Sequence, residues 1–237
     1  MSNQQKPQHF GKGHASAYDK QWEKVASITE ALHLLIRIRL SGLPDDANIL
    51  CVGAGTGSEI LYLANAFPGW TFTAVEPASS MLEVCRHRAE EAGIAARCTF
   101  HEGYLDSLPP SAPFHAATCL LVSQFILKPE ERRHFFCQIA ERLLPGGCLV
   151  SADLSSGASH SNYDNLMDVW LQFQSFRNSS GPITPEERQK SLDAYKNLVA
   201  VSPPREVEEL IASSGFDAPV LFFQALLIHA WYTTRTS

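Results

Sequence analysis

Short apolar runs alternate with amphipathic segments along the first two thirds of the chain. The runs that predict strands cover residues 49–52, 71–75, 97–101, 116–121 and 148–152. The segments that predict helices, by apolar residues spaced three and four apart, cover residues 17–40, 58–66, 79–92 and 129–144. Strands that alternate with helices of this length are typical of βαβ units and a parallel sheet.

The pattern changes after Asp153, where a polar stretch and several helices interrupt the alternation. The elements predicted there are a polar loop at 155–161, two helices up to residue 200 that are joined at 178–185, and a helix at 203–214. Two apolar runs, 219–223 and 226–233, follow with Gln224 and Ala225 between them. So short a link connects antiparallel strands only.

These elements together predict an α/β fold of three layers. We expect a doubly wound, mostly parallel seven-stranded sheet with a C-terminal antiparallel hairpin and a helical lid. Residues 1–14 are polar and are expected to form a flexible tail. Residues 15–237 are expected to form one domain, in which residues 15–42 contain an N-terminal lid helix and residues 155–200 a helical insertion.

The composition narrows the classes of function. Hydrophobic residues make up 45% and charged residues 19% of the 237 positions, which is the balance of a globular protein. The net charge of −6, with no basic run longer than Arg132 and Arg133, disfavours a nucleic-acid partner. The apolar runs fall far short of the roughly twenty residues that span a bilayer, so we expect no membrane partner.

The cysteine pattern bears on the cellular compartment. The six cysteines are scattered, without a Cys-x-x-Cys pair and without a histidine at ligand spacing. Most of them lie in apolar runs, where a free cysteine behaves as a small hydrophobic residue. We therefore expect a cytoplasmic protein with neither disulfide bonds nor a metal site.

A glycine-rich loop follows the first predicted strand, with Gly53, Gly55 and Gly57 at alternate positions before a helix. Glycine lets the backbone turn sharply and lets a ligand approach the main chain, and the helix presents free N–H groups to polar ligand atoms. Glu76 ends the next predicted strand, where a carboxylate can accept hydrogen bonds from both hydroxyls of a ribose. The loop and the acid predict a nucleoside-containing ligand, and a turn that merely joins strand to helix is the alternative.

The third glycine distinguishes between nucleoside ligands. A dinucleotide fingerprint requires glycine where this chain has Ser58, and the third glycine here comes one residue earlier. The Gly-x-Gly-x-Gly loop followed by Glu76 resembles the first two motifs of class I (Rossmann-like) S-adenosylmethionine-dependent methyltransferases of small-molecule type. Residues 102–109, 142–149 and 214–216 resemble later motifs of the same family.

This resemblance implies S-adenosyl-L-methionine as the cofactor and assigns a set of contacts to it. The implied contacts are Gly53, Ala54, Gly55, Gly57, Glu76, Pro77, Met81, Tyr104, Leu105 and Leu121. The sequence departs from the family at two of its positions. Cys51 stands where the family usually has an acidic residue, and Tyr104 stands where it often has an aspartate for the adenine amino group. Tyr104 can instead stack on the ring or donate from its hydroxyl.

The acceptor side carries no unique signature, because methyl transfer needs an aligned acceptor, exclusion of water and only sometimes a base. The family's Asn/Asp-Pro-Pro-Tyr motif is absent after the fourth predicted strand, and the segment 121–125 suits a small, partly apolar acceptor. The candidate catalytic residues are His14 and Tyr18, and further candidate bases are His9, His160 and Tyr163. The candidate substrate contacts are Gln124, Tyr163, Trp170 and Arg177.

Several of these candidates have a structural alternative. Tyr18 also fits a residue that packs at the start of a helix. Trp170 has the helical spacing to Phe173 and Phe176 that is typical of a lid core, and Arg177 fits an exposed residue at a helix end.

The sequence therefore predicts an enzyme that transfers a methyl group from S-adenosylmethionine to a small-molecule acceptor, and it allows a homodimer. A non-catalytic S-adenosylmethionine-binding module is one alternative, motivated by Cys51 and Tyr104. The layout of residues 165–226 is similar to carboxy-S-adenosylmethionine synthase, although the arginine of that family aligns near Leu192. An NAD-dependent oxidoreductase is the third alternative.

Overall fold

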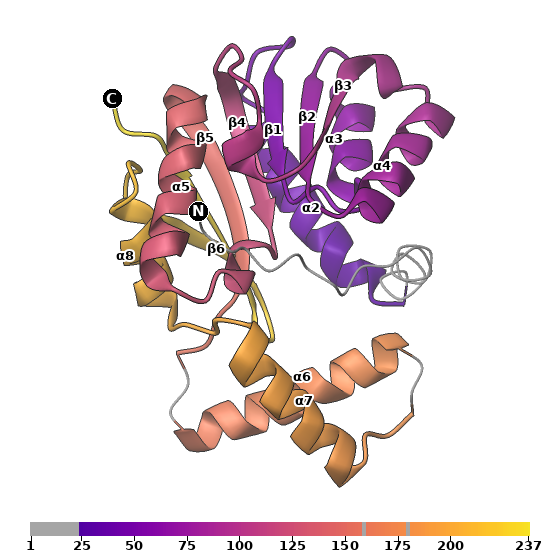
Figure 1. Cartoon of the computed structure of the whole chain (residues 1–237), viewed down its shortest axis with the longest axis vertical. Coiled ribbons are helices and arrows are strands. Elements are labelled where there is room, and N and C mark those ends of the chain that lie inside the picture. Colours follow the sequence, from indigo (N-terminus) through magenta and orange to yellow (C-terminus); the bar gives the residue numbers. More distant parts are fainter. Residues whose placement is uncertain (1–23, 158–159, 179–180) are drawn as a thin grey trace.

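A computed structural model describes residues 24–157, 160–178 and 181–237, with the backbone alone at 160 and 161. Its centre is a seven-stranded sheet in the order β3-β2-β1-β4-β5-β7-β6 (Figure 1). The strands are β1 (Asn48–Val52), β2 (Thr71–Glu76), β3 (Cys98–Glu102), β4 (Phe114–Leu120), β5 (Leu143–Leu154), β6 (Val220–Ala225) and β7 (Ile228–Thr234). The first five strands are parallel, and β6 and β7 form an antiparallel hairpin. The predicted sheet is confirmed.

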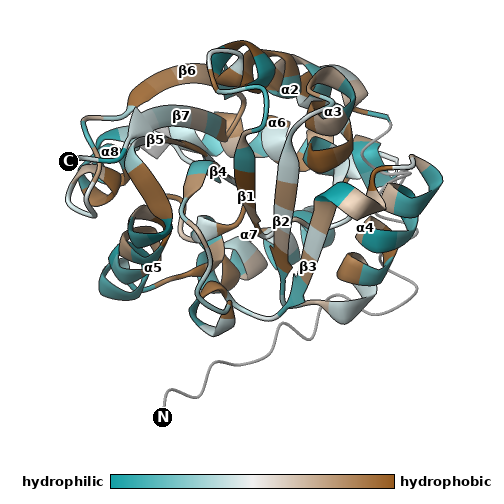
Figure 2. Ribbon diagram, turned by 90° about the horizontal axis from the view of Figure 1, so that it is seen from above, coloured by the Kyte–Doolittle hydropathy of each residue, from teal (hydrophilic) through white to brown (hydrophobic). Residues whose placement is uncertain are grey.

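Helices cover both faces of this sheet, which gives the three predicted layers (Figure 2). One face carries α2 (Ala26–Leu40), α3 (Ser58–Ala66) and α4 (Ser79–Glu91). The other face carries α5 (Pro129–Arg142) and α8 (Pro204–Ala212). In the parts of the chain that the structure describes, no helix is long and apolar enough to cross a membrane.

Each face of the sheet has its own apolar core. Ile49 and Cys51 of β1 pack against α2, α3 and α4, whereas Leu50 and Val52 of the same strand face α5 and α8. All four side chains are buried. Strands that are buried on both faces explain why the strand segments read as continuous apolar runs rather than as alternating ones. Much of β1 is accordingly brown in Figure 2, and the outer surfaces of α4 and α5 are largely teal.

Helices α6 (His160–Asn178) and α7 (Pro185–Leu198) lie between β5 and α8 in the chain, and we call them the insertion. They lie across the end of the sheet at which the parallel strands finish (Figure 1). Trp170 and Leu171 of α6 pack with Leu154 at the end of β5 and with Leu227 and Ile228 of the hairpin. The insertion therefore covers the edge at which open α/β sheets bind their ligands.

Two boundaries before the insertion differ from the prediction. The helix expected over 17–40 begins at Ala26, after a turn at Lys24 and Val25, and its earlier part lies outside the described residues. β5 begins at Leu143 rather than at 148, and α5 ends at Arg142. The cause is a tertiary contact, because Leu143 pairs with Phe114 of β4 across a shift in register.

The C-terminal hairpin is confirmed, but its turn lies two residues later than expected. Gln224 and Ala225 belong to β6, and the turn consists of Leu226 and Leu227. Leu226 has a φ of 54°, which is uncommon for a leucine. Both leucines pack against the apolar cluster under the insertion, and this packing offsets the strain. A turn of two apolar residues carries none of the usual hairpin signals, so the sequence could not locate it.

Candidate active site

The loop between β1 and α3 turns through three glycines with positive φ. The φ angles of Gly53, Gly55 and Gly57 are 70°, 55° and 79°. The N–H groups of Gly53 and Ala54 both donate to the carbonyl oxygen of Val75, at 2.8 and 3.1 Å, and so fix the loop over the end of β2. Residues with a Cβ are strained at these angles, and the glycine pattern therefore follows from the backbone.

The space around the three glycines separates their roles. A Cβ at Gly53 would lie 2.3 Å from Cγ2 of Val122, and a Cβ at Gly57 would lie 2.5 Å from Sγ of Cys85. A Cβ at Gly55 would meet, among the described residues, only Cε of Met81, at 3.8 Å. Packing within the protein thus requires Gly53 and Gly57, and the approach of a ligand to the main chain is open at Gly55.

Gly57→Ala tests this packing. Both Gly57 and Gly93, at the end of α4, have a positive φ, but a Cβ at Gly93 would have no described atom within 4 Å. We expect Gly93→Ala to lower the free energy of unfolding by about 1 kcal/mol through strain alone. The clash with Cys85 should add about 1–3 kcal/mol to the effect of Gly57→Ala. Denaturant unfolding measures both variants, and equal losses would contradict the tight packing of Gly57 on Cys85.

Glu76 ends β2 beside the glycine loop. Its Oε2 accepts a hydrogen bond from the N–H of Gly55 at 3.0 Å, and its Oε1 accepts one from the N–H of Ala78 at 2.9 Å. Burial raises the pKa of this carboxyl group, and the two N–H donors oppose the rise. Ala54 is buried next to it in the loop, and Pro77 is half-buried. Each carboxylate oxygen can accept a second hydrogen bond, so the oriented carboxylate can still receive two ligand hydroxyls.

The residues expected around an adenine ring adjoin Glu76. Tyr104 is 38% exposed, and the pKa of its phenol is raised by partial burial and by the carboxylates of Glu76 and Asp106. Leu105 begins the short helix η2 (Leu105–Ser107) and is buried, as is Met81 in the first turn of α4. The ends of β1, β2 and β3 therefore bring the glycine loop, the acid and an aromatic ring together.

The end of β4 closes the other side of the site. Leu121 has a φ of 59°, and its N–H donates to the carbonyl oxygen of Ala152 at 2.7 Å. Its side chain packs against the apolar cluster of the insertion. Val122 packs on Gly53, so the loops after β1 and β4 meet where the strand order reverses. This reversal is the usual ligand-binding point of a doubly wound sheet.

Gln124, a candidate substrate contact, is bonded to the protein itself and is buried. Its backbone N–H donates to Oδ1 of Asp153 at 2.9 Å, and its side-chain Oε1 accepts from the N–H of Leu154 at 2.8 Å. Its carbonyl oxygen accepts from the N–H of Ala200, just after α7, at 2.8 Å. These bonds tie the loop after β4 to β5 and to the insertion, which assigns Gln124 a positioning role in the described structure.

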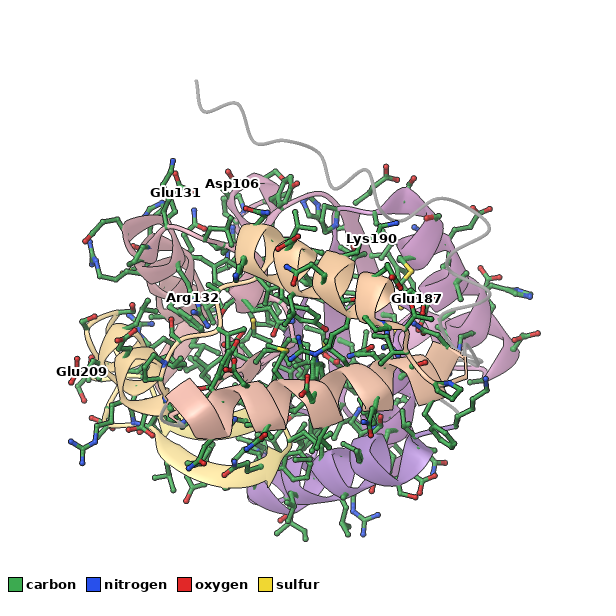
Figure 3. The ribbon with its side chains drawn as sticks, turned by 90° about the horizontal axis from the view of Figure 1, so that it is seen from below. Asp106, Glu131, Arg132, Glu187, Lys190 and Glu209 are labelled. Carbon is green, nitrogen blue, oxygen red and sulfur yellow. The ribbon has the colours of Figure 1, made fainter. Side chains whose placement is uncertain are left out.

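A buried ion pair underlies the same loop. Nη2 of Arg132 lies 3.0 Å from Oδ2 of Asp153, and the two side chains are 3% and 0% exposed. The hydroxyl of Ser123, in the short helix η3 (Ser123–Phe125), donates to Oδ2 of Asp153 at 2.8 Å and accepts from Nε of Arg132 at 2.9 Å. Figure 3 shows Arg132 inside the molecule, whereas its neighbour Glu131 lies at the rim.

Neither this pair nor Glu59 was predicted from the sequence. Glu59 lies in the first turn of α3, is 7% exposed, and accepts a hydrogen bond at Oε1 from the hydroxyl of Thr118 at 2.6 Å. Burial raises the pKa of Glu59 to about 7, although the hydrogen bonds from Thr118 and Cys51 lower it. The sequence did contain a signal for the burial of Glu59. Leu63 follows it by four residues, and the two side chains therefore share the buried face of α3.

The candidates on the insertion lie in or beside its apolar cluster. Trp170 is buried, donates from Nε1 to the hydroxyl of Tyr195 at 2.7 Å, and stacks on Phe173 with a centroid distance of 5.3 Å. It therefore belongs to the core of the insertion. Tyr163 and Arg177 are half-buried. Outside the described part of the chain are His9, His14, Tyr18 and the side chain of His160.

Residues 49–147 match a protein-family model described as a methyltransferase domain. Among curated proteins, a carboxy-S-adenosyl-L-methionine synthase of Pseudomonas putida is 27% identical over 163 residues, which cover 67% of this chain and 63% of that protein. The chain thus spans less than two thirds of the length of the curated relatives it matches.

Solved structures with the same fold include methyltransferases. A putative O-methyltransferase from Nostoc punctiforme has a TM-score of 0.65 and 15% identity, and the match covers 89% of this chain and 58% of that chain. Human N-acetylserotonin methyltransferase, solved in complex with S-adenosylmethionine, has a TM-score of 0.64 and 13% identity over 96% of this chain and 57% of that chain. At these identities the likeness concerns the fold.

Proposed function

The chain carries a methyltransferase domain of the class I, Rossmann-like type, and on this premise we propose that it transfers the methyl group of S-adenosyl-L-methionine to a small-molecule acceptor. The observation that carries the proposal is the carboxylate of Glu76, which the N–H groups of Gly55 and Ala78 hold beside the glycine loop. A carboxylate with free acceptor capacity at this position suits a ribose. Ser58, in place of the third dinucleotide glycine, favours a single nucleoside over NAD.

The residues around Glu76 suit the remaining parts of this cofactor. The open Cα face of Gly55 lets the ligand approach the main chain. Tyr104, Leu105 and Met81 offer one half-exposed ring and two apolar side chains to an adenine. When bound, S-adenosylmethionine supplies an activated methyl group on a sulfonium centre.

The insertion would form the acceptor side. Helices α6 and α7 cover the edge of the sheet next to the loops after β1 and β4, and such a cover excludes water from the reacting groups. The side chains near this edge are aromatic and apolar, with Tyr163 and Arg177 as half-buried polar groups, and we expect a small, partly apolar acceptor. His14 and Tyr18 remain the candidate base and positioning residue. The scattered cysteines support a reducing, cytoplasmic setting.

A carboxy-S-adenosylmethionine synthase activity, suggested by the relatives of that name, would need a cation for the added carboxylate. Leu192, near which the arginine of that family aligns, packs half-buried against the apolar cluster of the insertion. That position therefore offers no cation. A non-catalytic S-adenosylmethionine-binding module would bind the same cofactor as an enzyme, so only a measurement of turnover distinguishes the two.

Binding of S-adenosylhomocysteine tests the cofactor assignment. We expect calorimetry to detect this ligand, and we expect Glu76→Ala to weaken binding by about 2–3 kcal/mol, or roughly 30- to 150-fold, through the loss of ribose hydrogen bonds. Glu90→Ala, in an exposed residue near the end of α4, is the matched control and should bind like the wild type. Binding of NADH in place of S-adenosylhomocysteine would support the oxidoreductase alternative.

Turnover is tested with S-adenosylmethionine labelled in its methyl group and an extract of small metabolites. Methyl transfer predicts label in a metabolite and, at a concentration of labelled S-adenosylmethionine below the dissociation constant of Glu76→Ala, much less label in the same extract incubated with that variant. Tight binding without label in any fraction would favour the non-catalytic module, and label in RNA or protein would contradict the small-molecule acceptor.

A further inference from the structure

A carboxylic acid lies buried directly behind the glycine loop, and the contacts proposed so far do not use it. Glu59 follows Gly57 by two residues and is 7% exposed. Its hydrogen-bond partners are Thr118 of β4 and Cys51 of β1, which are opposite each other in the register of the two strands. The carboxyl group therefore lies at the junction of β1 and β4, just before both strands end.

This junction is the point at which the strand order reverses. From β1 the chain first builds β2 and β3 on one side and then crosses to β4 on the other. The loops that leave the two strands diverge at such a point, and a ligand binds in the crevice between them. A carboxyl group beneath the crevice is placed to meet a charged part of that ligand.

Within the described residues, the groups that act on the pKa of Glu59 carry no positive charge. Its two hydrogen-bond partners are a hydroxyl and a thiol. The thiols of Cys51 and Cys119 have pKa values raised well above the ordinary value by burial, and burial raises that of Cys85 in α4 to about 12, so all three are neutral. Burial without a cation favours the protonated form of Glu59 and raises its pKa to about 7.

Two further charged groups lie near Cys85, on which Glu59 also acts. Glu76 and Arg88 both act on the thiol of Cys85. The guanidinium of Arg88 donates to the carbonyl oxygen and hydroxyl of Thr56 and to the hydroxyl of Ser58, which orders the start of α3. A buried acid in such a setting is costly to the fold, and a ligand that brings its own cation would compensate it.

We propose that Glu59 binds the ammonium group at the amino-acid end of S-adenosylmethionine, and that it releases its proton to solvent as the ligand binds. The inference rests on the proposed function and assigns a residue to the end of the cofactor opposite Glu76. One O–H bond of the carboxylic acid breaks, its proton passes to water or buffer, and the carboxylate forms an ion pair with the ammonium group. No electron transfer is involved. Glu59 thus supplies, from α3, the negative charge that Cys51 cannot supply from β1.

Calorimetry in buffers of different protonation enthalpy measures the proton release directly. For S-adenosylhomocysteine, which has the ammonium group, we expect close to one proton released at about pH 6 and almost none at about pH 8. Methylthioadenosine lacks the amino-acid end and should bind without proton release at either pH. The comparison of the two ligands uses the unmodified protein and does not depend on the folding of any variant.

Two substitutions test whether the released proton comes from the carboxyl group of Glu59. Glu59→Gln should abolish the proton release and weaken S-adenosylhomocysteine about 10- to 100-fold while leaving methylthioadenosine unchanged. Thr118→Val keeps the acid but removes a hydrogen bond that favours its charged form, so proton release should persist to higher pH than in the wild type.

Binding of S-adenosylhomocysteine without proton release at about pH 6 would overturn the inference and leave the proposed function intact. Equal weakening of both ligands by Glu59→Gln would also overturn it, because that result indicates a general distortion of the loop. Failure of the wild type to bind either ligand would instead overturn the proposed function, and this inference with it.

Discussion

We expect Arg132→Met to lower the free energy of unfolding by about 3–5 kcal/mol, because it leaves the carboxylate of Asp153 buried without its cation. Asp153 is fully buried, and Arg132 lies 3.0 Å from it. Burial already raises the pKa of Asp153, and Arg132 opposes this rise. Without the arginine the pKa of Asp153 should rise further, so the loss should be smaller at acid pH, where the carboxyl group takes up a proton. Denaturant unfolding at neutral and acid pH measures both effects.

Arg133→Met is the matched control for this prediction. Arg133 is the next residue of α5, and its Nε lies 3.6 Å from Glu130, with both side chains exposed. Such a surface pair contributes less than about 1 kcal/mol. Similar losses in the two variants would show that the buried pair contributes no more than a surface pair. The double variant Arg132→Met/Asp153→Leu should recover much of the loss, because it removes both charges together.

The ion pair also bears on the site, since it holds the loop after β4. Asp153 accepts hydrogen bonds from Ser123 and from the backbone of Gln124, and Gln124 in turn bonds to the chain after α7. Loss of the pair frees one loop that borders the crevice and one attachment of the insertion. A reduced affinity for cofactor should therefore accompany the reduced stability of Arg132→Met.

The elements of the fold were largely predictable because their signals are local. Strands buried on both faces give continuous apolar runs, and the helices between them show regular spacing. The boundaries that differed depend on distant contacts. β5 begins early because Leu143 meets Phe114, and the hairpin turns at Leu226 and Leu227 because both pack under the insertion.

The residues of the site also divide into those with a local sequence signal and those that depend on distant contacts. The glycine loop and Glu76 belong to one short motif, and the structure holds them together through the bond from Gly55 to Glu76. Glu59 and Asp153 were missed because their burial depends on partners that are distant in the sequence, although the spacing of Glu59 to Leu63 indicates the buried face of α3. The partner of Glu59 is Thr118, 59 residues away, and the partner of Asp153 is Arg132 on α5, the helix that joins β4 to β5. The burial of a charge is a property of the assembled layers.

We expect Glu59→Gln to raise the free energy of unfolding at about pH 8 by about 3 kcal/mol, and to have little effect near about pH 4. Burial raises the pKa of Glu59 from 4.5 to about 7. As the pH rises through this window, the unfolded chain loses the proton before the folded chain does. The contribution of Glu59 to wild-type stability therefore falls between pH 4.5 and about 7 and does not change further at higher pH. Glutamine is neutral throughout and can still accept the hydrogen bond from Thr118, so the variant should escape this fall.

The size of the effect follows from the linkage between proton binding and folding. A pKa difference of about 2.5 units, at about 1.4 kcal/mol per unit, corresponds to about 3 kcal/mol, and the near-complete burial of Glu59 leaves little solvent screening. Glu83→Gln, in an exposed residue of α4, should leave the pH dependence unchanged. Destabilisation by Glu59→Gln at every pH would show that the acid serves the fold. Stabilisation together with weaker binding of S-adenosylhomocysteine would show that the acid serves ligand binding at a cost to the stability of the fold.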